Sequence, residues 1–373
     1  MPSPAMDVGA GDMASGDMAS GDMASGDMGR ALKVIQWATG NIGSRALRAV
    51  IEHPRLELAG VWVSSPEKAG RDAGALCGLP DTGIRATASV DEACAIAADC
   101  VLYMRQGTDA EELCRLLASG RNVVTTRGDF HHPAGMDPAL RQRIEAACVA
   151  GGTSLYSTGS SPGFITEALA IPLVSLSRRL DCLTIDEFAD LSSRNSPGLL
   201  FDVMGFGKAI GPFQQERADH VRADFSGSLT QLADGLGIAV ERWQAKGEYA
   251  AARTDQPIAA GLIRAGTMAA QRITVEGLAG DTVRFRFRAN WYAARDLDAA
   301  GWDLRESGWR VRVDGDTPLD VGITFPVAPE HYAAFTPGLT AHRAVNAVAS
   351  VCAAPPGIRT TIDLPQVIAR FAA

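Results

Sequence analysis

Three side chains that could move a proton follow one apolar segment, residues 122–126. They are Asp129, His131 and His132, and Pro133 comes directly after them. A carboxylate beside a reacting carbon stabilises positive charge and carries protons, and a histidine titrates near pH 6.5 and can protonate an alkoxide. We therefore predict these three residues as catalytic candidates. Two alternatives stay open, namely that the aspartate caps its loop and that the histidine pair only shapes a turn before the proline.

A second set of residues could hold a dinucleotide. The segment 33–37 has the composition of a buried strand, residues 38–43 read Ala-Thr-Gly-Asn-Ile-Gly, a helix is predicted to residue 50, and 56–63 is again apolar. In such a strand, loop and helix, Gly40 would let the backbone approach a pyrophosphate and Gly43 would let the helix pack closely on the strand. The helix start adds free amides and a positive dipole end, so we predict that Thr39, Asn41 and Ile42 also bind the cofactor.

The residues after the next strand bear on which dinucleotide is bound. Sites that prefer NAD place an acidic residue about 20 positions beyond the glycines, whereas NADP sites place hydroxyls and cations there. Here Ser64 and Ser65 end the strand and Lys68 follows. This order predicts NADP, with NAD possible because Glu67 could serve a site that accepts both.

The first half of the chain continues with short strands and helices in alternation. Strands are predicted at 99–105, 122–126 and 153–157, and helices at 110–119 and 138–150. This order predicts a parallel, doubly wound sheet of Rossmann type. Ligands in such sheets lie beyond the carboxyl ends of the strands, which singles out residues 103–106, 125–132 and 158–163, with Thr126 among them.

From about residue 180 the pattern changes to a period of two. Strands are predicted at 182–188, 272–276, 282–291, 309–314 and 319–325, and the charged residues Arg284, Arg286 and Arg288 alternate with apolar ones. This pattern predicts an α+β domain with a mostly antiparallel sheet that has one solvated face. We expect a Rossmann domain over 31–165, completed by a C-terminal helix within about 336–373, and a second domain over 166–335.

The bulk properties narrow the class of protein. The net charge of −8 gives no basic footprint for nucleic acid or an anionic membrane, and no apolar run is long enough to span a bilayer. The seven cysteines are odd in number and never spaced as C-x-x-C, which indicates thiols in a reducing cytoplasm and no metal site. Residues 1–30 carry a Gly-Asp-Met-Ala-Ser repeat with few large apolar side chains, so a disordered tail is predicted.

Three motifs carry a resemblance to a known family. They are Lys-Val-Ile-Gln-Trp-Ala-Thr-Gly-Asn-Ile-Gly from Lys33, Ser-Thr-Gly-Ser-Ser-Pro-Gly-Phe from Ser157, and Val-Cys-Ala-Ala-Pro-Pro-Gly-Ile from Val351. Together they resemble the dihydrodipicolinate reductase-like superfamily. The resemblance is to the branch of 2,4-diaminopentanoate dehydrogenase and the native NAD(P)H-dependent amine dehydrogenases of actinobacterial type, and it covers nearly the whole chain after residue 30.

The resemblance implies a homodimer, with 166–335 as the substrate and dimerisation domain and a substrate cleft between the two domains. It also places the loop of Gly159 and Pro162 beside the nicotinamide, and the strand end of Tyr103, Met104 and Arg105 against the cofactor. Relatives reduce a C=N bond formed from a ketone and ammonia, or oxidise the amine.

The loop after the fifth strand departs from the family pattern. Relatives place a glutamate there, at about Gly128 and Asp129 of this chain, and an aspartate is one methylene shorter, so a small misplacement is costly. We therefore expect an NAD(P)H-dependent oxidoreductase acting on a C=N or C=O carbon of a small, largely apolar substrate, most closely an amine dehydrogenase. The alternatives are a ketone or aldehyde reductase that needs no ammonia, and a catalytically silent NADP-binding protein.

Overall fold

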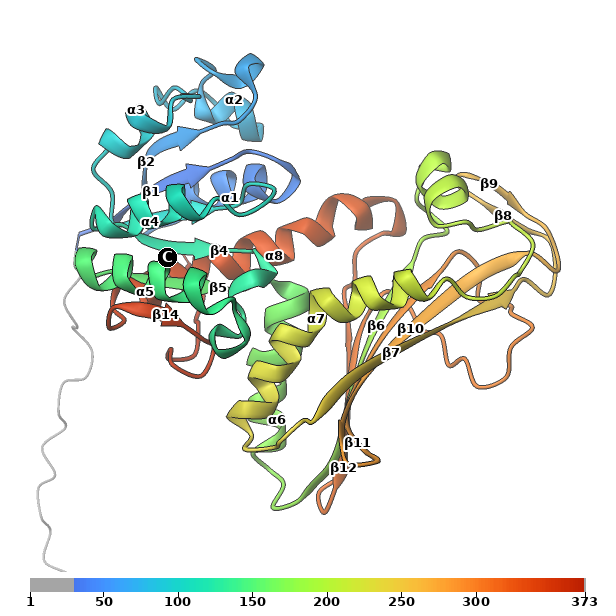
Figure 1. Ribbon diagram of the computed structural model, residues 1–373. Coiled ribbons are helices and arrows are strands. Elements are labelled where there is room, and N and C mark those ends of the chain that lie inside the picture. Colours follow the sequence, from blue (N-terminus) through green and yellow to red (C-terminus); the bar gives the residue numbers. More distant parts are fainter. Residues whose placement is uncertain (1–29, 372–373) are drawn as a thin grey trace, which may run out of the picture.

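The computed structural model describes residues 30–371, which form two lobes, each built on a six-stranded sheet (Figure 1). The predicted disordered repeat tail lies outside the described residues except for Arg30. Arg30 forms an ion pair with Asp99, the residue directly before the strand Cys100–Tyr103. None of the helices within 30–371 combines the length and the apolar character needed to cross a membrane.

The first sheet is entirely parallel, as the alternation of short strands and helices predicts. Its last strand comes from the C-terminal end of the chain, so the two ends of the described chain lie in one sheet. The strands, in order across the sheet, are β14 (Gly357–Arg359), β5 (Ser154–Ser157), β4 (Asn122–Thr125), β3 (Cys100–Tyr103), β1 (Leu32–Trp37) and β2 (Leu56–Trp62).

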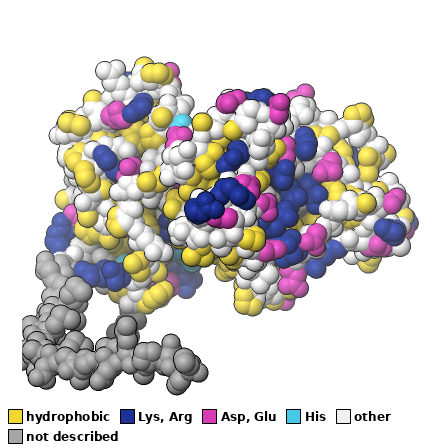
Figure 2. All heavy atoms as spheres, turned by 90° about the horizontal axis from the view of Figure 1, so that it is seen from below, with side chains coloured by type: hydrophobic (Ala, Val, Ile, Leu, Met, Phe, Trp, Pro, Cys, Tyr) yellow, Lys and Arg dark blue, Asp and Glu magenta, His cyan; other side chains and the backbone are white. Residues whose placement is uncertain are grey.

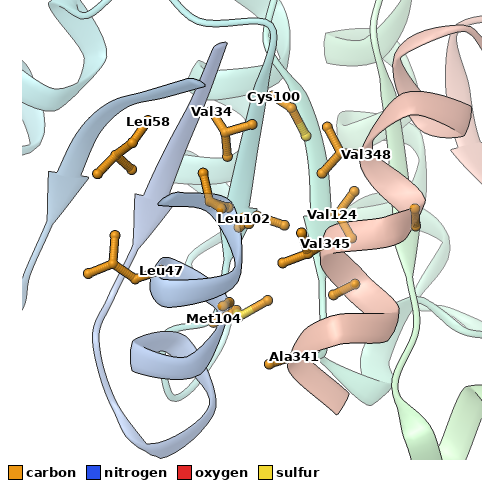
Figure 3. Packing of buried hydrophobic residues seen from close by; sticks show 14 of the residues in the cluster. Val34, Leu47, Leu58, Cys100, Leu102, Met104, Val124, Ala341, Val345 and Val348 are labelled. Carbon is orange, nitrogen blue, oxygen red and sulfur yellow. The ribbon is translucent and has the colours of Figure 1, made fainter. Parts of the chain in front are cut away.

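Helices cover both faces of the first sheet. Alternate strand residues point to opposite faces, so Val34 packs with α1 (Asn41–Ile51) and α8 (Pro329–Cys352), as Figure 3 shows. Its neighbour Ile35 packs on the other face against α4 (Ala110–Ala118) and α5 (Pro138–Gly151). The three layers confirm the predicted fold class for this half of the chain. Between these elements stand only short helices, namely η1 (Pro66–Lys68), α2 (Ala73–Cys77), α3 (Val90–Ala95), η2 (Gly128–Phe130) and η3 (Pro133–Gly135).

The second sheet is mixed and mostly antiparallel, again as expected. Its six strands form five neighbouring pairs. Of these pairs, only that of β6 and β11 is parallel. The strands, in order across the sheet, are β13 (Leu319–Thr324), β12 (Gly308–Gly315), β6 (Leu180–Asp190), β11 (Thr282–Tyr292), β10 (Met268–Ala279) and β7 (Arg242–Ala251), and the two-stranded ribbon of β8 (Gln256–Ile258) and β9 (Gly261–Ile263) stands apart.

Two helices cover one face of this sheet, and the sequence did not indicate the longer one. The helices are α6 (Ala170–Val174) and α7 (Gln215–Gly235). The buried side of α7 includes Ser228 and Gln231 beside Leu229 and Leu232, so polar residues interrupt the helical apolar pattern. The segment 192–211, which follows β6, contains the short helix η5 (Gly198–Val203).

The opposite face of the second sheet carries the arginine stripe. Instead of being merely solvated, as expected, these side chains are paired: Arg286 Nε lies 2.9 Å from Glu276 Oε1, and Arg288 forms an ion pair with Asp186. Figure 2 shows Lys and Arg side chains interspersed with Asp and Glu on the second lobe. The neighbouring strands supply the acids because residues on one sheet face lie side by side across strands.

The connection between the lobes uses two segments. The first is the irregular helix η4 (Ser160–Ala168), which follows β5 and leads into α6. The second is α8, which begins at Pro329, before the expected start at about residue 336, and contains Pro337 inside it. A proline in a helix interior removes a hydrogen bond and predicts a helix boundary, which is why the first two turns were missed. These two segments bring the ends of the parallel strands close to the second sheet.

Candidate functional site

A cavity of about 550 Å³ opens beyond the carboxyl ends of β1, β2, β3 and β4. We call it the first cavity. It lies where ligands bind in open parallel sheets. Its lining consists of Ala38, Thr39, Gly40, Asn41, Ile42, Val63, Ser64, Ser65, Lys68, Met104, Arg105, Gln106, Thr126 and Arg127.

In the loop after β1, Ala38 has a backbone conformation that glycine usually adopts. Ala38 takes a left-handed conformation with φ of 72°, the conformation that favours glycine at this point. Gly43 packs directly on this turn, since a Cβ there would lie 2.2 Å from the carbonyl oxygen of Ala38. Gly40 faces open space, with no atom within 4 Å of an added Cβ. The two glycines therefore have different tasks, close packing for Gly43 and access for Gly40.

The start of α1 offers hydrogen-bond donors to the first cavity. The first intrahelical bond runs from Ser44 N to Gly40 O, at 2.9 Å, so the amides of Asn41, Ile42 and Gly43 have no helical acceptor. No side chain caps this end. A phosphate is the kind of group that such amides bind.

The residues after β2 place a cation at the same cavity. Lys68 Nζ donates to Thr39 O at 2.8 Å and to Thr39 Oγ1 at 3.3 Å, which ties it to the glycine loop. Ser65 Oγ donates to the carboxylate of Glu67, while Ser64 has an exposed side chain. Glu67 is therefore hydrogen-bonded to Ser65, and Lys68 lines the first cavity.

Arg105 is held at the wall of the first cavity by Glu112. Its NH1 lies 3.0 Å from Glu112 Oε1, and its guanidinium lies 5.6 Å from the ring centre of Trp62. Glu112 also accepts a hydrogen bond of 3.0 Å from Trp37 Nε1. Glu112 and Trp62 therefore hold the guanidinium of Arg105 in place. The exposed part of its side chain lines the first cavity.

Four residues predicted to bind the cofactor do not line the first cavity. Tyr103 is fully buried, its hydroxyl accepts a hydrogen bond from Asp109 N at 3.2 Å, and burial raises its pKa. Gly43 lies beneath the loop. Gly159 and Pro162 belong to the segment after β5, on the side of the second sheet. Tyr103 is the last residue of β3, and its side chain packs into the core on the face of the sheet that α4 and α5 cover.

Asp129, the first catalytic candidate, lies at the surface in η2. Its carboxylate accepts a hydrogen bond of 2.6 Å from Thr108 Oγ1 and pairs with Arg127 NH2 at 3.2 Å. It lines neither the first cavity nor the second cavity described below. Its neighbour Arg127 does line the first cavity, so Asp129 contacts the candidate site through that residue.

The two histidines have different surroundings, although they are adjacent. His131 is buried, and its Nδ1 lies 2.9 Å from Glu167 Oε1. The buried carboxylate of Glu167 also accepts hydrogen bonds from Ser228 on α7 and from Thr361 near the C-terminal end. His132 contacts α7 through Asp234 at the surface, at 2.9 Å. The structure therefore brings the histidine pair against α7 and not to either cavity.

A second cavity, of about 280 Å³, lies between η4, the start of α8 and the inner face of the second sheet. Glu187 of β6 is its most distinctive residue, because it places a carboxyl among aromatic and aliphatic side chains. Trp309 Nε1 donates to Glu187 Oε2 at 3.3 Å. The lining consists of Ser160, Ser161, Glu187, Phe188, Ala189, Asp190, Leu191, Ser193, Arg194, Ser307, Gly308, Trp309, Phe325, Tyr332, Ala333, Thr336 and Leu339.

Two contacts show that the cavities are neighbours. Strands β4 and β5 pair through Thr125 and Ser157, so the residues that follow them, at the first cavity and in η4, leave the same sheet edge. Arg45 of α1 donates to Asn41 O at 2.6 Å and to Ala334 O at 2.9 Å. Asn41 lines the first cavity, and the residue before Ala334 lines the second. Arg45 thus links the walls of the two cavities.

Glu167 and Glu187 were not predicted from the sequence as residues of interest. Glu187 had a signal, since it follows Leu183 and Ile185 at a spacing of two and therefore occupies an apolar position of a strand. Glu167 had none, because it lies in the irregular η4, where no period identifies the buried face. Its partners come from segments more than 30 residues away in the sequence, and such contacts are not visible in a local pattern.

Comparison with known proteins decides the family resemblance. No family model matches the chain. An amine dehydrogenase from Streptomyces virginiae is 26% identical over 347 residues, which are 90% of this chain and 96% of that protein. This chain is similar in sequence to that amine dehydrogenase. The fold agrees, since the amine dehydrogenase structure from Mycobacterium smegmatis superposes with a TM-score of 0.67 at 20% identity, over 91% of this chain and 97% of that chain. The resemblance predicted from the three sequence motifs is confirmed.

Proposed function

We propose that this protein is an NAD(P)H-dependent oxidoreductase that transfers hydride to a C=N or C=O carbon of a small, largely apolar substrate, as an amine dehydrogenase does. One observation carries the proposal: ten of the fourteen residues predicted from the sequence to bind the cofactor line a single cavity. The cavity lies at the carboxyl ends of parallel strands, the usual place for a dinucleotide. The similarity to the Streptomyces virginiae amine dehydrogenase supports the reaction type.

The residues present fit a dinucleotide. The open space at Gly40 allows a pyrophosphate to approach the backbone, and the amides of Asn41, Ile42 and Gly43 would bind its oxygens. Lys68 stands at the same wall and would neutralise phosphate charge. When bound, a nicotinamide cofactor supplies the hydride, and the protein supplies position and proton transfer.

We propose NADP as the preferred cofactor, because Lys68 is at hand and Ser65 engages the single acid. Ser64→Asp should weaken NADPH binding at least tenfold and leave NADH binding equal or tighter, since a carboxylate repels the 2′-phosphate and accepts a bond from the 2′-hydroxyl. Calorimetric titration of both cofactors measures this. Thr282→Asp, which adds the same charge on an exposed strand of the second lobe, is the control. Equal affinities of wild type and Ser64→Asp for NADPH would contradict the proposal.

The reaction itself is tested by following NADPH oxidation with a panel of small ketones and aldehydes, with and without ammonium. We expect turnover that depends on ammonium and gives the amine, identified by mass spectrometry. Equal rates with and without ammonium would favour the second candidate, a reductase that needs no ammonia. The position of Asp129 at the surface, where it pairs with Arg127, favours this second candidate. NADPH binding without any turnover would leave a silent binding protein.

Two expectations from the sequence remain predictions. They are the cytoplasm as the compartment and the homodimer as the assembly. Both come from composition and from the family resemblance, and neither is needed for the proposed reaction.

A further inference from the structure

Glu187 stands at a position of β6 that otherwise faces the apolar core. Leu183 and Ile185, at a spacing of two, are buried in the core against α7, and Glu187 is the next residue on that face. Its neighbour across the sheet is Trp309, whose Nε1 donates to the carboxyl at 3.3 Å. A carboxyl is therefore placed at the point where the core opens into the second cavity.

This carboxyl has no charged partner among residues 30–371. Its pKa is raised because burial disfavours the carboxylate, and the nearby polar groups of Ser161, Trp309 and Trp291 only partly oppose that effect. The side chain of Glu187 is half-buried. The part of it that is exposed faces the second cavity. A buried carboxylate without a cation is costly, so it either holds a proton or meets a cation that enters the cavity.

A second polar group in the same cavity has no hydrogen-bond partner among the described residues. The hydroxyl oxygen of Ser161 is buried and makes no hydrogen bond within the described part of the chain. Ser161 lies in the segment after β5 that the family resemblance places beside the nicotinamide, and it faces the cavity together with Glu187. Two groups able to bind a polar atom thus line one small space, Ser161 from the connecting segment η4 and Glu187 from the second sheet.

The remaining lining limits what can enter. Trp309, Phe325, Tyr332 and Leu339 make most of the wall apolar, and about 280 Å³ is just below the usual 300–1,000 Å³ of ligand pockets. Of the other charged residues, Asp190 is paired with Arg295, and Arg194 is exposed at the rim. No buried cation is present among the lining residues to receive a carboxylate, so amino acids and keto acids fit poorly.

We propose that the second cavity is the substrate site, that it takes small apolar primary amines and their imines without a carboxylate group, and that Glu187 is the catalytic carboxyl that binds the substrate nitrogen. The inference rests on the proposed function. It gives the amine chemistry a carboxyl on β6 in place of the glutamate that is absent from the loop of Asp129.

The proton balance follows from this placement. Protonated Glu187 donates its proton to the nitrogen of the imine formed from ketone and ammonia, and the positive charge that develops there is stabilised by the carboxylate left behind. The carbon receives hydride from the nicotinamide cofactor, the C=N double bond becomes a single bond, and a neutral amine results. Water then returns a proton to Glu187. In the opposite direction the carboxylate takes the proton from the amine.

Binding tests the proposal without turnover. n-Butylamine is titrated calorimetrically into the protein saturated with NADP⁺, and n-butanol and butyrate serve as neutral and anionic probes of similar length. We expect wild type to bind butylamine at least tenfold more tightly than either other probe. Glu187→Gln should remove that preference and leave NADP⁺ binding unchanged, whereas Glu248→Gln, an exposed carboxyl on β7, should keep it. A preference for butylamine that survives in Glu187→Gln would overturn the role of Glu187.

Unfolding and turnover separate a catalytic from a structural role. Because the folded-state pKa of Glu187 is raised, the folded protein binds more protons than the unfolded chain, and this residue lowers stability as pH rises through that window. Glu187→Gln should thus be at least as stable as wild type at pH 8, while its turnover with ketone and ammonium falls 100-fold or more. Lower stability with unchanged turnover would mean a structural residue.

The failure of this inference can be told apart from failure of the proposed function. If wild type binds no NADPH and shows no turnover, the proposed function fails. If wild type is active but Ser161→Ala and Glu187→Gln both keep its rate and its affinity for butylamine, only the assignment of the second cavity fails.

Discussion

Replacing Gly43 by alanine is expected to lower the free energy of unfolding by about 1–3 kcal/mol, the range for overpacking a tight interior. The added Cβ would lie 2.2 Å from Ala38 O and 3.1 Å from Gln36 Nε2. These two atoms are themselves hydrogen-bonded at 2.8 Å, so the obstacle is a braced backbone turn and not the end of a flexible side chain. Urea unfolding followed by circular dichroism measures the change.

Gly40→Ala is the matched control in the same loop. Nothing lies within 4 Å of its added Cβ, and φ is −73°, so the change in stability should stay below about 1 kcal/mol. The methyl group would, however, enter the space where a pyrophosphate approaches, and NADPH affinity should fall at least tenfold. If Gly43→Ala were as stable as wild type, or if Gly40→Ala bound NADPH normally, the division of tasks between the two glycines would be wrong.

Replacing His131 by alanine is expected to cost about 2–4 kcal/mol of stability, because it leaves the carboxylate of Glu167 buried without its nitrogen partner. The side chains of both residues are 2% exposed, and 2.9 Å separates His131 Nδ1 from Glu167 Oε1. The hydrogen bonds to Glu167 from Ser228 and Thr361 would remain, which is why the loss should stop short of unfolding. Thermal and urea unfolding at pH 7 provide the measurement.

His132→Ala gives the comparison one residue away. Its partner Asp234 is 56% exposed, and a surface pair of this kind contributes about 0–1 kcal/mol. The sequence analysis predicted both histidines as catalytic. Should His131→Ala keep the stability of wild type while it loses turnover, that catalytic prediction would be supported and the structural account of Glu167 would fail.

Much of the first cavity, the proposed cofactor site, could be predicted from the sequence because its signals are local. The strand, loop and helix around Gly40 follow each other within about 20 residues, and the strand ends at Ser64 and Arg105 follow from the parallel order. The same rule could not decide which way a side chain at a strand end points, and Tyr103 turned into the core. Position along the chain predicted the cavity better than it predicted each lining residue.

The second cavity, the proposed substrate site, was harder to predict because its residues meet across the fold. Ser161, Glu187 and Trp309 come from η4, β6 and β12, and only the pairing of β6 with β12 brings the last two together. The catalytic residues expected in the loop of Asp129 were chosen for their type, although type does not show whether a side chain faces a cavity. Glu187, by contrast, is a charged residue at a position of β6 where the alternation predicts an apolar one. That signal was present in the sequence.

The central claim is that the first cavity holds the hydride donor and the second cavity the acceptor. A crystal structure with NADP⁺ bound tests it most directly. We expect the pyrophosphate against the amides at the start of α1, the 2′-phosphate near Ser64 and Lys68, and the nicotinamide ring beside Ser161 with one face toward Glu187. A nicotinamide ring that faces away from the second cavity, or a cofactor bound outside the first cavity, would contradict the account.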